Sequence, residues 1–146
     1  MKLNKMNVRF LKEVKNLKNS MPAHFKLVTH NNTTLILDVY GAPSTIYSGE
    51  IFTLKIEIND NYPIDPPTAV FIKNIPENEH VYTNGHICIS VLHDDWSPAM
   101  TLEMVVIAIL SMLSDAKKKS KPPDNYFYTV FKRNKSPRDT KWVYHK

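Results

Sequence analysis

Hydrophobic residues near the N-terminus recur every three or four positions, with charged residues between them. This spacing places the hydrophobic side chains on one face of a helix, which can then pack against a core. The run Asn19-Ser20-Met21-Pro22 follows and predicts the end of the helix, because proline cannot continue it. The hydrophobic face consists of Leu3, Met6, Phe10, Leu11, Val14 and Leu17.

Two segments in the middle of the chain alternate hydrophobic and polar residues instead. The alternation runs over 35–39 and 52–58 and is typical of strands with one buried face. Turn-forming residues separate the two segments. The run Tyr62-Pro63-Ile64-Asp65-Pro66-Pro67 then precedes a further hydrophobic run at 68–72. We therefore expect an antiparallel meander of about four strands.

The second half of the chain combines a long irregular segment with further helices. Residues 73–98 show little periodicity, and long ordered loops of this kind usually carry function. Thr101 can cap the next helix, and Asp124 can cap a short helix after the basic, proline-containing run 117–123. The helix after Thr101 is expected to be largely buried through Leu102, Val105, Val106, Ile109, Leu110 and Leu113.

The composition fits one α+β domain. The chain has 146 residues, 42% of them hydrophobic, which suffices for one core. We expect a core domain over 1–134 and a basic, flexible tail over 135–146. A single cysteine excludes an intramolecular disulfide and points to a reducing compartment, and no Cys/His spacing suits a metal site. Without a signal-peptide pattern or about 18 consecutive apolar residues, the chain is expected to be soluble and intracellular.

The single cysteine, Cys88, is the strongest candidate for chemistry. It follows the turn Thr83-Asn84-Gly85 inside a hydrophobic segment, so its sulfur is expected at the edge of the core, supported yet reachable. A thiolate is both a good nucleophile and a good leaving group. A buried structural cysteine is the alternative. The net charge of +5 also allows a small basic nucleic-acid-binding domain, although the strands offer no aromatic platform for bases.

Five short segments, taken in order, resemble the ubiquitin-conjugating enzyme family over nearly the whole chain. The resemblance implies the α+β ubiquitin-conjugating fold, with an N-terminal helix, a four-stranded antiparallel meander, a long active-site loop, a buried central helix and a short C-terminal helix. It also implies that Cys88 accepts ubiquitin from an activating enzyme as a thioester and passes it to an amine. The segments are Gly41-Ala42-Pro43, Tyr47-Ser48-Gly49-Glu50-Ile51-Phe52, Tyr62-Pro63 with Pro66-Pro67, Gly85-His86-Ile87-Cys88 and Trp96-Ser97-Pro98-Ala99.

His80 stands eight residues before Cys88, where the family usually has the asparagine of a His-Pro-Asn motif. An imidazole there can donate a hydrogen bond to developing negative charge, or accept a proton from an attacking amine. Capping the loop is the alternative role. The W-type members of the family also have histidine at this position, but this chain has Asn78-Glu79 where they have His-Pro.

Three further segments, 111–114, 122–128 and 140–145, also resemble the W type. Members of this type attach ubiquitin to the α-amino group of flexible N-termini, so the resemblance implies the same acceptor. Asp124 corresponds to the acidic residue that borders the cysteine in the family, where it can orient or deprotonate the incoming amine. A plain helix N-cap is its alternative role. We interpret His86 and His93 as polar loop residues.

The resemblance also implies partners. They are ubiquitin, an activating enzyme, a RING or U-box ligase and substrates with accessible N-termini, but neither nucleic acid nor a membrane. It implies no cofactor, because ATP is used by the activating enzyme, and a cytoplasmic or nuclear location. A non-catalytic scaffold of the same fold is the alternative, although such variants usually lack the cysteine. The residues that correspond to the surface for the ligase and the activating enzyme are Arg9, Lys12, Ile64, Ser97, Pro98 and Ala99.

Overall fold

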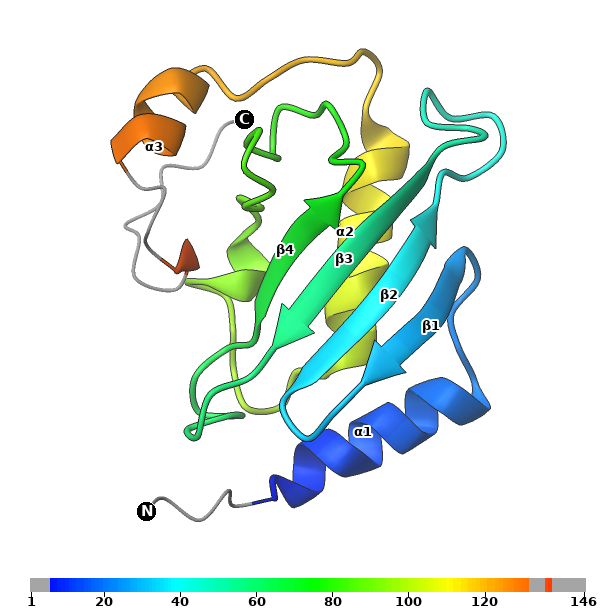
Figure 1. Cartoon of the computed structure of the whole chain (residues 1–146), viewed down its shortest axis with the longest axis vertical. Coiled ribbons are helices and arrows are strands. Elements are labelled where there is room, and N and C mark those ends of the chain that lie inside the picture. The colour runs from blue at the N-terminus through cyan, green and yellow to red at the C-terminus, as the bar shows by residue number, and fades with distance from the viewer. Residues whose placement is uncertain (1–5, 132–135, 138–146) are drawn as a thin grey trace.

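A four-stranded antiparallel sheet with one long helix behind it organises the molecule (Figure 1). The structure is a computed structural model that describes residues 6–131 and 136–137. No helix in this part of the chain has the length and apolar character needed to cross a membrane. In chain order the elements are α1 (Val8–Asn19), β1 (Phe25–His30), β2 (Thr34–Tyr40), β3 (Ile51–Glu57), β4 (Thr68–Lys73), a 3-10 turn (Ser90–Leu92), α2 (Leu102–Asp115) and α3 (Asn125–Phe131).

The sheet is the predicted meander, with spatial order β1-β2-β3-β4. β2 and β3 each bury alternate residues, and Leu37 lies opposite Leu54 in the register between them. These two strands and β4 were predicted from their patterns. β1 was expected only as a member of the meander, because a single one of its six residues, Phe25, is buried and no alternation is visible.

α1 begins later than its hydrophobic pattern suggests. Asn7 caps the helix, and its side-chain oxygen accepts a hydrogen bond from the Phe10 amide at 3.0 Å. Met6, which was assigned to the buried face, precedes the helix and is exposed, while Leu3 lies outside the described residues. The predicted core positions Phe10, Val14 and Leu17 are buried, and Leu11 is half-buried at the edge of the core.

α2 is the buried helix that the sequence predicts. Thr101 caps it by accepting a hydrogen bond from the Met104 amide at 3.2 Å. Five of the six residues expected to face inward are buried, and Leu110 is half-buried against the same core. Figure 1 shows α2 lying across the rear face of the sheet, between the sheet and solvent. This arrangement makes α2 the floor against which the irregular segment after β4 packs.

Gly85 sets the path of that irregular segment. Its φ of 91° lies in the left-handed region, and a Cβ at this position would stand 1.9 Å from the Phe71 carbonyl oxygen. Only glycine therefore fits the turn, and the Phe71 amide donates a 2.9 Å hydrogen bond back to the Gly85 carbonyl. The turn is joined to β4 by a bridge between Val70 and His86, so residues 85–88 are held against the sheet.

The predicted boundary between core and tail falls at 134/135, outside the described residues. Within the expected tail the structure describes Ser136 and Pro137, and Pro137 is buried. The short helix predicted after Asp124 is confirmed as α3.

Candidate active site

Cys88 lies in a narrow ribbon of backbone that fixes its position. Val81 and Ile87 form a bridge, and the Cys88 amide donates a 2.8 Å hydrogen bond to the carbonyl of His80. The backbone that carries His80 therefore runs directly beside the backbone that carries Cys88. This contact explains how residues eight positions apart in the sequence meet in one site.

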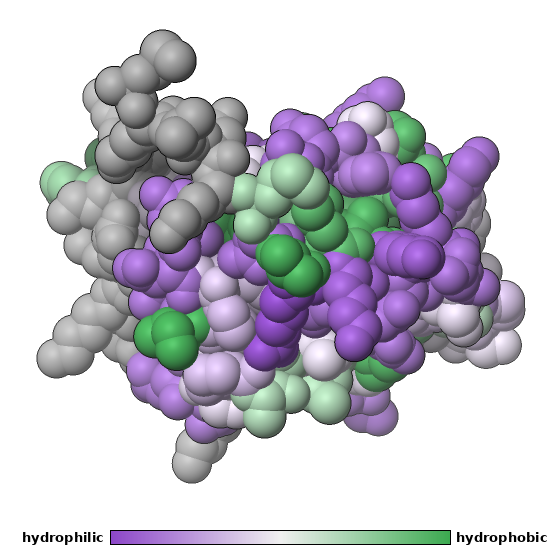
Figure 2. Space-filling model, turned by 90° about the horizontal axis from the view of Figure 1, so that it is seen from below, coloured by the Kyte–Doolittle hydropathy of each residue, from purple (hydrophilic) through white to green (hydrophobic). Residues whose placement is uncertain are grey.

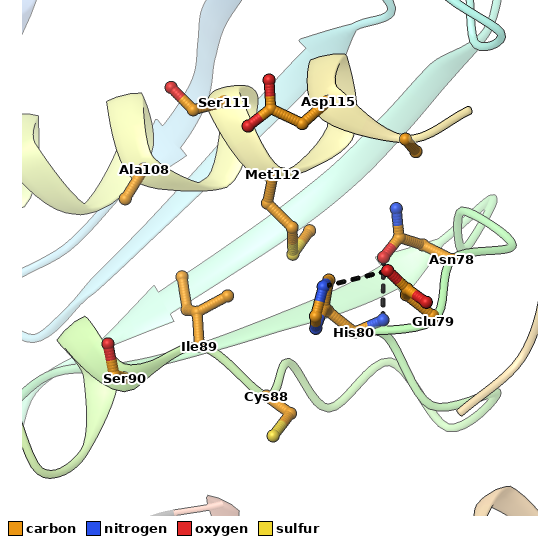
Figure 3. A pocket seen from close by; sticks show the side chains of 11 residues that line it. Asn78, Glu79, His80, Cys88, Ile89, Ser90, Ala108, Ser111, Met112 and Asp115 are labelled. Atoms are coloured by element: carbon orange, nitrogen blue, oxygen red, sulfur yellow. Dashed lines mark hydrogen bonds and ion pairs between the residues drawn. The ribbon is translucent and has the colours of Figure 1, made fainter. Parts of the chain in front are cut away.

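A cavity of about 480 Å³ opens between α2 and this ribbon. Figure 3 shows that the Ile89 side chain and the His80 ring point toward α2, whereas the sulfur of Cys88 points away from the helix. Cys88 therefore borders the cavity, but its sulfur lies on the face of the ribbon that is turned away from α2. The cavity is lined by Asn78, Glu79, His80, Cys88, Ile89, Ser90, Ala108, Ser111, Met112, Asp115 and Ala116.

The sulfur of Cys88 packs against two tyrosines and is less accessible than expected. Cys88 is only 2% exposed and forms a buried cluster with Tyr82 and Tyr128. The two tyrosine rings stack with centroids 3.8 Å apart, and Tyr128 belongs to α3. The hydrophobic pattern did not predict that Tyr128 covers the sulfur, because Tyr128 lies 40 positions after Cys88 in the sequence.

Asp124 stands at the same cluster, as predicted for a residue that borders the cysteine. The hydroxyl of Tyr82 donates to both carboxylate oxygens of Asp124, at 3.0 and 3.1 Å. Burial and the negative charge of Asp124 together raise the pKa of the Cys88 thiol to about 12. Desolvation and the same carboxylate also raise the pKa of Tyr82. At neutral pH the free protein therefore holds Cys88 as a thiol.

His80 is half-buried, and its imidazole lies beside a carboxylate. His80 Nε2 is 3.4 Å from a carboxylate oxygen of Glu79, and its backbone amide donates to the side-chain oxygen of Asn78 at 2.8 Å (Figure 3). The imidazole and the sulfur of Cys88 point to different sides of the ribbon. The structure brings the two residues together through the backbone, and a catalytic role of the imidazole stays a prediction.

Asn78 is a site residue whose role the sequence analysis did not identify. It is 1% exposed, and its side-chain nitrogen donates to the Tyr47 hydroxyl at 3.1 Å while its oxygen accepts from the His80 amide. Tyr47 in turn donates to the Glu77 carbonyl at 2.5 Å. Asn78 therefore fixes the loop that carries His80. In the sequence, the only sign of this role was that Asn78-Glu79 replaces the His-Pro of the W type.

His86 lies in the irregular segment after β4, as expected of a loop residue, but its side chain is packed rather than exposed. His86 is 9% exposed, and its Nδ1 lies 2.6 Å from the Tyr128 hydroxyl. Burial lowers its pKa. His93 is half-buried, with Nε2 3.5 Å from the Ile87 carbonyl oxygen, and burial lowers its pKa to about 4. Tyr128 of α3 covers the His86 ring, and the His93 ring contacts the Ile87 carbonyl; the local sequence does not reveal either contact.

A second group of predicted residues lies at the opposite end of the molecule, on and beside α1. The guanidinium of Arg9 donates to the backbone carbonyls of Pro98 and Met100, so α1 holds the loop that carries Ser97, Pro98 and Ala99. That loop is exposed over Ser97-Pro98-Ala99, as is Lys12. Figure 2 views this end and shows mostly hydrophilic side chains with small, separate hydrophobic groups.

Ile64 belongs to the same surface through Trp96. The Trp96 indole donates a 2.9 Å hydrogen bond to the Pro63 carbonyl, and Ile64 beside it is 72% exposed. An aliphatic side chain this exposed between prolines suits a shallow hydrophobic pocket on a partner. The structure thus gathers Arg9, Ile64 and the 97–99 loop on one surface, and their binding role stays a prediction.

Glu13 is the residue of this surface that the sequence analysis missed. Its carboxylate accepts from the Leu102 amide at 2.9 Å and from the Tyr62 hydroxyl at 2.5 Å, and it pairs with Arg9 at 3.5 Å. The carboxylate thus holds the first turn of α2, where the helix dipole favours negative charge. Its burial could have been predicted from its position three residues after Phe10, on the buried face of α1.

Comparison with known proteins agrees with this geometry. The sequence model of the family described as "Ubiquitin-conjugating enzyme" matches residues 9–145. The chain is 45% identical to a probable ubiquitin-conjugating enzyme E2 W-A of Danio rerio, over 96% of this chain and 95% of the relative. It is 40% identical to the ubiquitin-conjugating enzyme E2 W of Caenorhabditis elegans, over 94% and 93%.

Solved structures show the same fold. The crystal structure of the ubiquitin-conjugating enzyme E2 UbcA1 from Agrocybe aegerita superposes with a TM-score of 0.84 and 32% identity, over 89% of this chain and 96% of that one. A ubiquitin-conjugating enzyme E2 from Plasmodium falciparum gives 0.73 and 39%, over 76% and 100%. The fold, the buried cysteine ribbon and the similarity along the chain lead to one conclusion: the chain belongs to the ubiquitin-conjugating enzyme family, with W-type members among its relatives.

Proposed function

We propose that this enzyme carries ubiquitin as a thioester on Cys88 and transfers it to the α-amino group of protein N-termini. Family membership establishes ubiquitin transfer, with an activating enzyme and ligases as general partners. The observation that supports Cys88 as the carrier is its place in the molecule: the only thiol of the chain borders the 480 Å³ cavity, beside Asp124.

Charging is an exchange of thioesters. The sulfur of Cys88 attacks the ubiquitin carbonyl on the activating enzyme, the new C–S bond forms, the old C–S bond breaks, and the thiol proton leaves with the released thiolate. Because the pKa of Cys88 lies near 12, proton removal must accompany the approach of the two sulfurs. Once the sulfur is acylated it carries no negative charge. Asp124 therefore does not repel the ubiquitin thioester as it would repel the free thiolate.

Transfer joins the ubiquitin carbonyl to an amine. The amine nitrogen attacks the thioester, the C–S bond breaks with Cys88 leaving as thiolate, and the amine loses a proton. We assign acceptance of this proton to Asp124, whose carboxylate is held beside the sulfur by Tyr82. We assign hydrogen bonding to the developing oxyanion to His80, whose carbonyl accepts from the Cys88 amide; its imidazole must turn to the sulfur side of the ribbon for this step.

Amine chemistry and the W-type relatives support the proposed acceptor. With a reference pKa of about 7.8, roughly a quarter of exposed α-amines are neutral at pH 7.4, against about 0.1% of lysines with a pKa of about 10.4. A site with one half-buried carboxylate as its base therefore suits α-amines better than lysines. Relatives named E2 W support the same choice.

The remaining parts of the proposal concern partners and location. The surface formed by Arg9, Ile64 and the 97–99 loop, with Lys12 beside it, is assigned to a RING or U-box ligase, and the α1 part of it to the activating enzyme. The enzyme is proposed to act without a cofactor, since ATP is spent by the activating enzyme, and in the cytoplasm or nucleus.

One set of reactions tests the function. The enzyme is mixed with ubiquitin, ATP and an activating enzyme, and a reductant-sensitive adduct is expected that Cys88→Ala abolishes. The charged enzyme is then given two versions of a lysine-containing peptide, one with a free and one with an acetylated N-terminus. Modification of the free peptide alone supports the α-amine acceptor. Equal modification of both peptides contradicts it, and the absence of any adduct contradicts the thioester.

A further inference from the structure

α3 is a seven-residue helix whose position depends on its contacts with the active-site ribbon. A helix this short is not stable by itself in water, so tertiary contacts must hold it. Its outer aromatic residues Tyr126, Phe127 and Phe131 are 64–70% exposed, whereas Tyr128 is 6% exposed. Tyr128 is therefore the side chain through which α3 is anchored.

His86 is the anchor point for Tyr128. Its Nδ1 lies 2.6 Å from the Tyr128 hydroxyl, and its ring meets the Tyr128 ring edge to face, with centroids 5.5 Å apart. His86 itself is fixed, because its carbonyl accepts from the Tyr82 amide at 2.9 Å and its backbone bridges to Val70 of β4. The hydrogen bond thus ties α3 to the sheet through a residue two positions before Cys88.

Tyr128 contacts both of the groups that lie at the sulfur, Tyr82 and Asp124. Its ring stacks on Tyr82, whose hydroxyl donates to Asp124. The Tyr128 amide also donates to the Asp124 carbonyl at 3.0 Å, so Asp124 and Tyr128 share the first turn of α3. A second contact between Asn125 and Thr83 joins the same segments, but Thr83 is exposed to water and this contact is correspondingly weaker.

We propose that His86 and Tyr128 are positioning residues for ubiquitin transfer. Their hydrogen bond holds α3 against the ribbon, and α3 in turn holds Tyr82 and Asp124 at the sulfur of Cys88. Neither residue takes part in bond making. The proposal rests on the proposed thioester at Cys88, and it adds the means by which the acid at that site is kept in place for the attacking amine.

The first test removes the hydroxyl and keeps the ring. Tyr128→Phe should charge with ubiquitin fully, react faster with iodoacetamide as the free enzyme, and discharge onto a free N-terminus about three- to tenfold more slowly through kcat, the cost of one buried hydrogen bond. Tyr126→Phe is the matched control, since it makes the same change on the exposed side of α3 and should leave both rates unchanged.

The second test uses His86. His86→Leu should repeat the effects of Tyr128→Phe, and the double variant should be no slower than either single variant, because both remove one interaction. His86→Asn should restore most of the discharge rate, since its amide reaches the place of Nδ1 and can bond the tyrosine hydroxyl. A substitution that acts only through global stability would lower the unfolding midpoint without slowing discharge at temperatures well below it. All rates are measured well below the unfolding midpoint of each variant.

The outcomes separate this inference from the proposed function. If wild-type Cys88 accepts no ubiquitin, the function and the inference both fail. If charging is normal but Tyr128→Phe leaves iodoacetamide reactivity unchanged, the hydroxyl does not hold α3 and the inference alone fails. If reactivity rises while discharge stays at the wild-type rate, α3 is held by the pair but its position does not matter for transfer, which also overturns the inference.

Discussion

Cys88 and Asp124 show how two residues can oppose each other in the free enzyme and cooperate after charging. Burial and, after it, the carboxylate favour the neutral thiol, which raises the pKa of Cys88 to about 12. A thiol that is held neutral resists oxidation and alkylation, because the thiolate is the reactive form. The same carboxylate is proposed to accept a proton once the sulfur is acylated. The position of Asp124 beside Cys88 therefore both protects the free thiol and is proposed to assist transfer from the thioester.

Removal of the charge at Asp124 is expected to make the free thiol more reactive. Asp124→Asn should lower the pKa of Cys88, so that at pH 8 a larger fraction is thiolate and alkylation by iodoacetamide is faster. The rate is followed by mass spectrometry between pH 7 and 10. Asp95→Asn, an exposed position, is the matched control for loss of a carboxylate. An unchanged rate in Asp124→Asn would show that burial alone sets the pKa.

His80→Asn tests the imidazole at the position that the family usually gives to asparagine. Charging should survive, because the backbone hydrogen bond between His80 and Cys88 does not use the side chain. Discharge onto N-terminal amines should slow at neutral pH if the imidazole assists the attack. Single-turnover discharge is measured from pH 6 to 9. A wild-type rate across this range would exclude proton acceptance by the imidazole, but not the assigned hydrogen bond to the oxyanion, which the asparagine amide can also donate.

At the scale of elements, the ends of α1 and α2 are joined by a buried carboxylate. Glu13 of α1 accepts from the first amide of α2 and from Tyr62, and Arg9 reaches two carbonyls just before α2. The proposed ligase surface is therefore built from segments about 90 residues apart that share one polar network. Its shape depends on Glu13 although Glu13 itself is 8% exposed.

Glu13→Ala should destabilise the fold by roughly 2–3 kcal/mol, because it leaves the Leu102 amide and the Tyr62 hydroxyl buried without an acceptor. Glu13→Gln should cost less, since its amide oxygen still accepts one of these bonds. Urea unfolding gives both values. Lys12→Ala, on the exposed face of the same helix, is the control and should change stability by less than about 0.5 kcal/mol. A similar loss in both alanine variants would contradict the role of Glu13.

The elements that the sequence predicts well are those whose burial is periodic. α2, β2, β3 and β4 each show their pattern locally, and Thr101 caps α2 as expected. β1 buries one residue and could not be placed from periodicity, whereas α1 was placed by its pattern except for its start at the Asn7 cap, which the pattern does not mark. Periodicity indicates which residues of an element are buried along its own length, but it does not indicate which other segments contact them.

At the scale of the whole molecule, the same limit explains what could be predicted of the site. The ordered short motifs predicted the family, Cys88 and the neighbourhood of Asp124. They did not predict that Tyr128 covers the sulfur or that His86 is buried beneath α3, since both contacts span about 40 residues. Nor could they predict that Arg9 binds the carbonyls of Pro98 and Met100. Such contacts arise only when the sheet and helices bring distant segments together.

The packed side chains of His86 and His93 should make the stability of the fold sensitive to mild acid. The pKa of His93 is lowered to about 4 and that of His86 is also lowered. Between pH 6.5 and 4 these histidines are therefore protonated to a greater extent in the unfolded chain than in the folded protein. The free energy of unfolding should therefore fall as pH drops below 6.5 and show no contribution from these rings above it. His93→Gln keeps a side-chain donor for the Ile87 carbonyl but cannot titrate, so its stability should fall less between pH 7 and 4.5 than that of the wild type.

Urea unfolding at each pH measures this slope, and the same substitution at exposed His30 controls for the change of residue. Equal slopes for His93→Gln and the wild type would mean that the ring takes up its proton without unfolding, and that the 3-10 turn opens locally in acid instead.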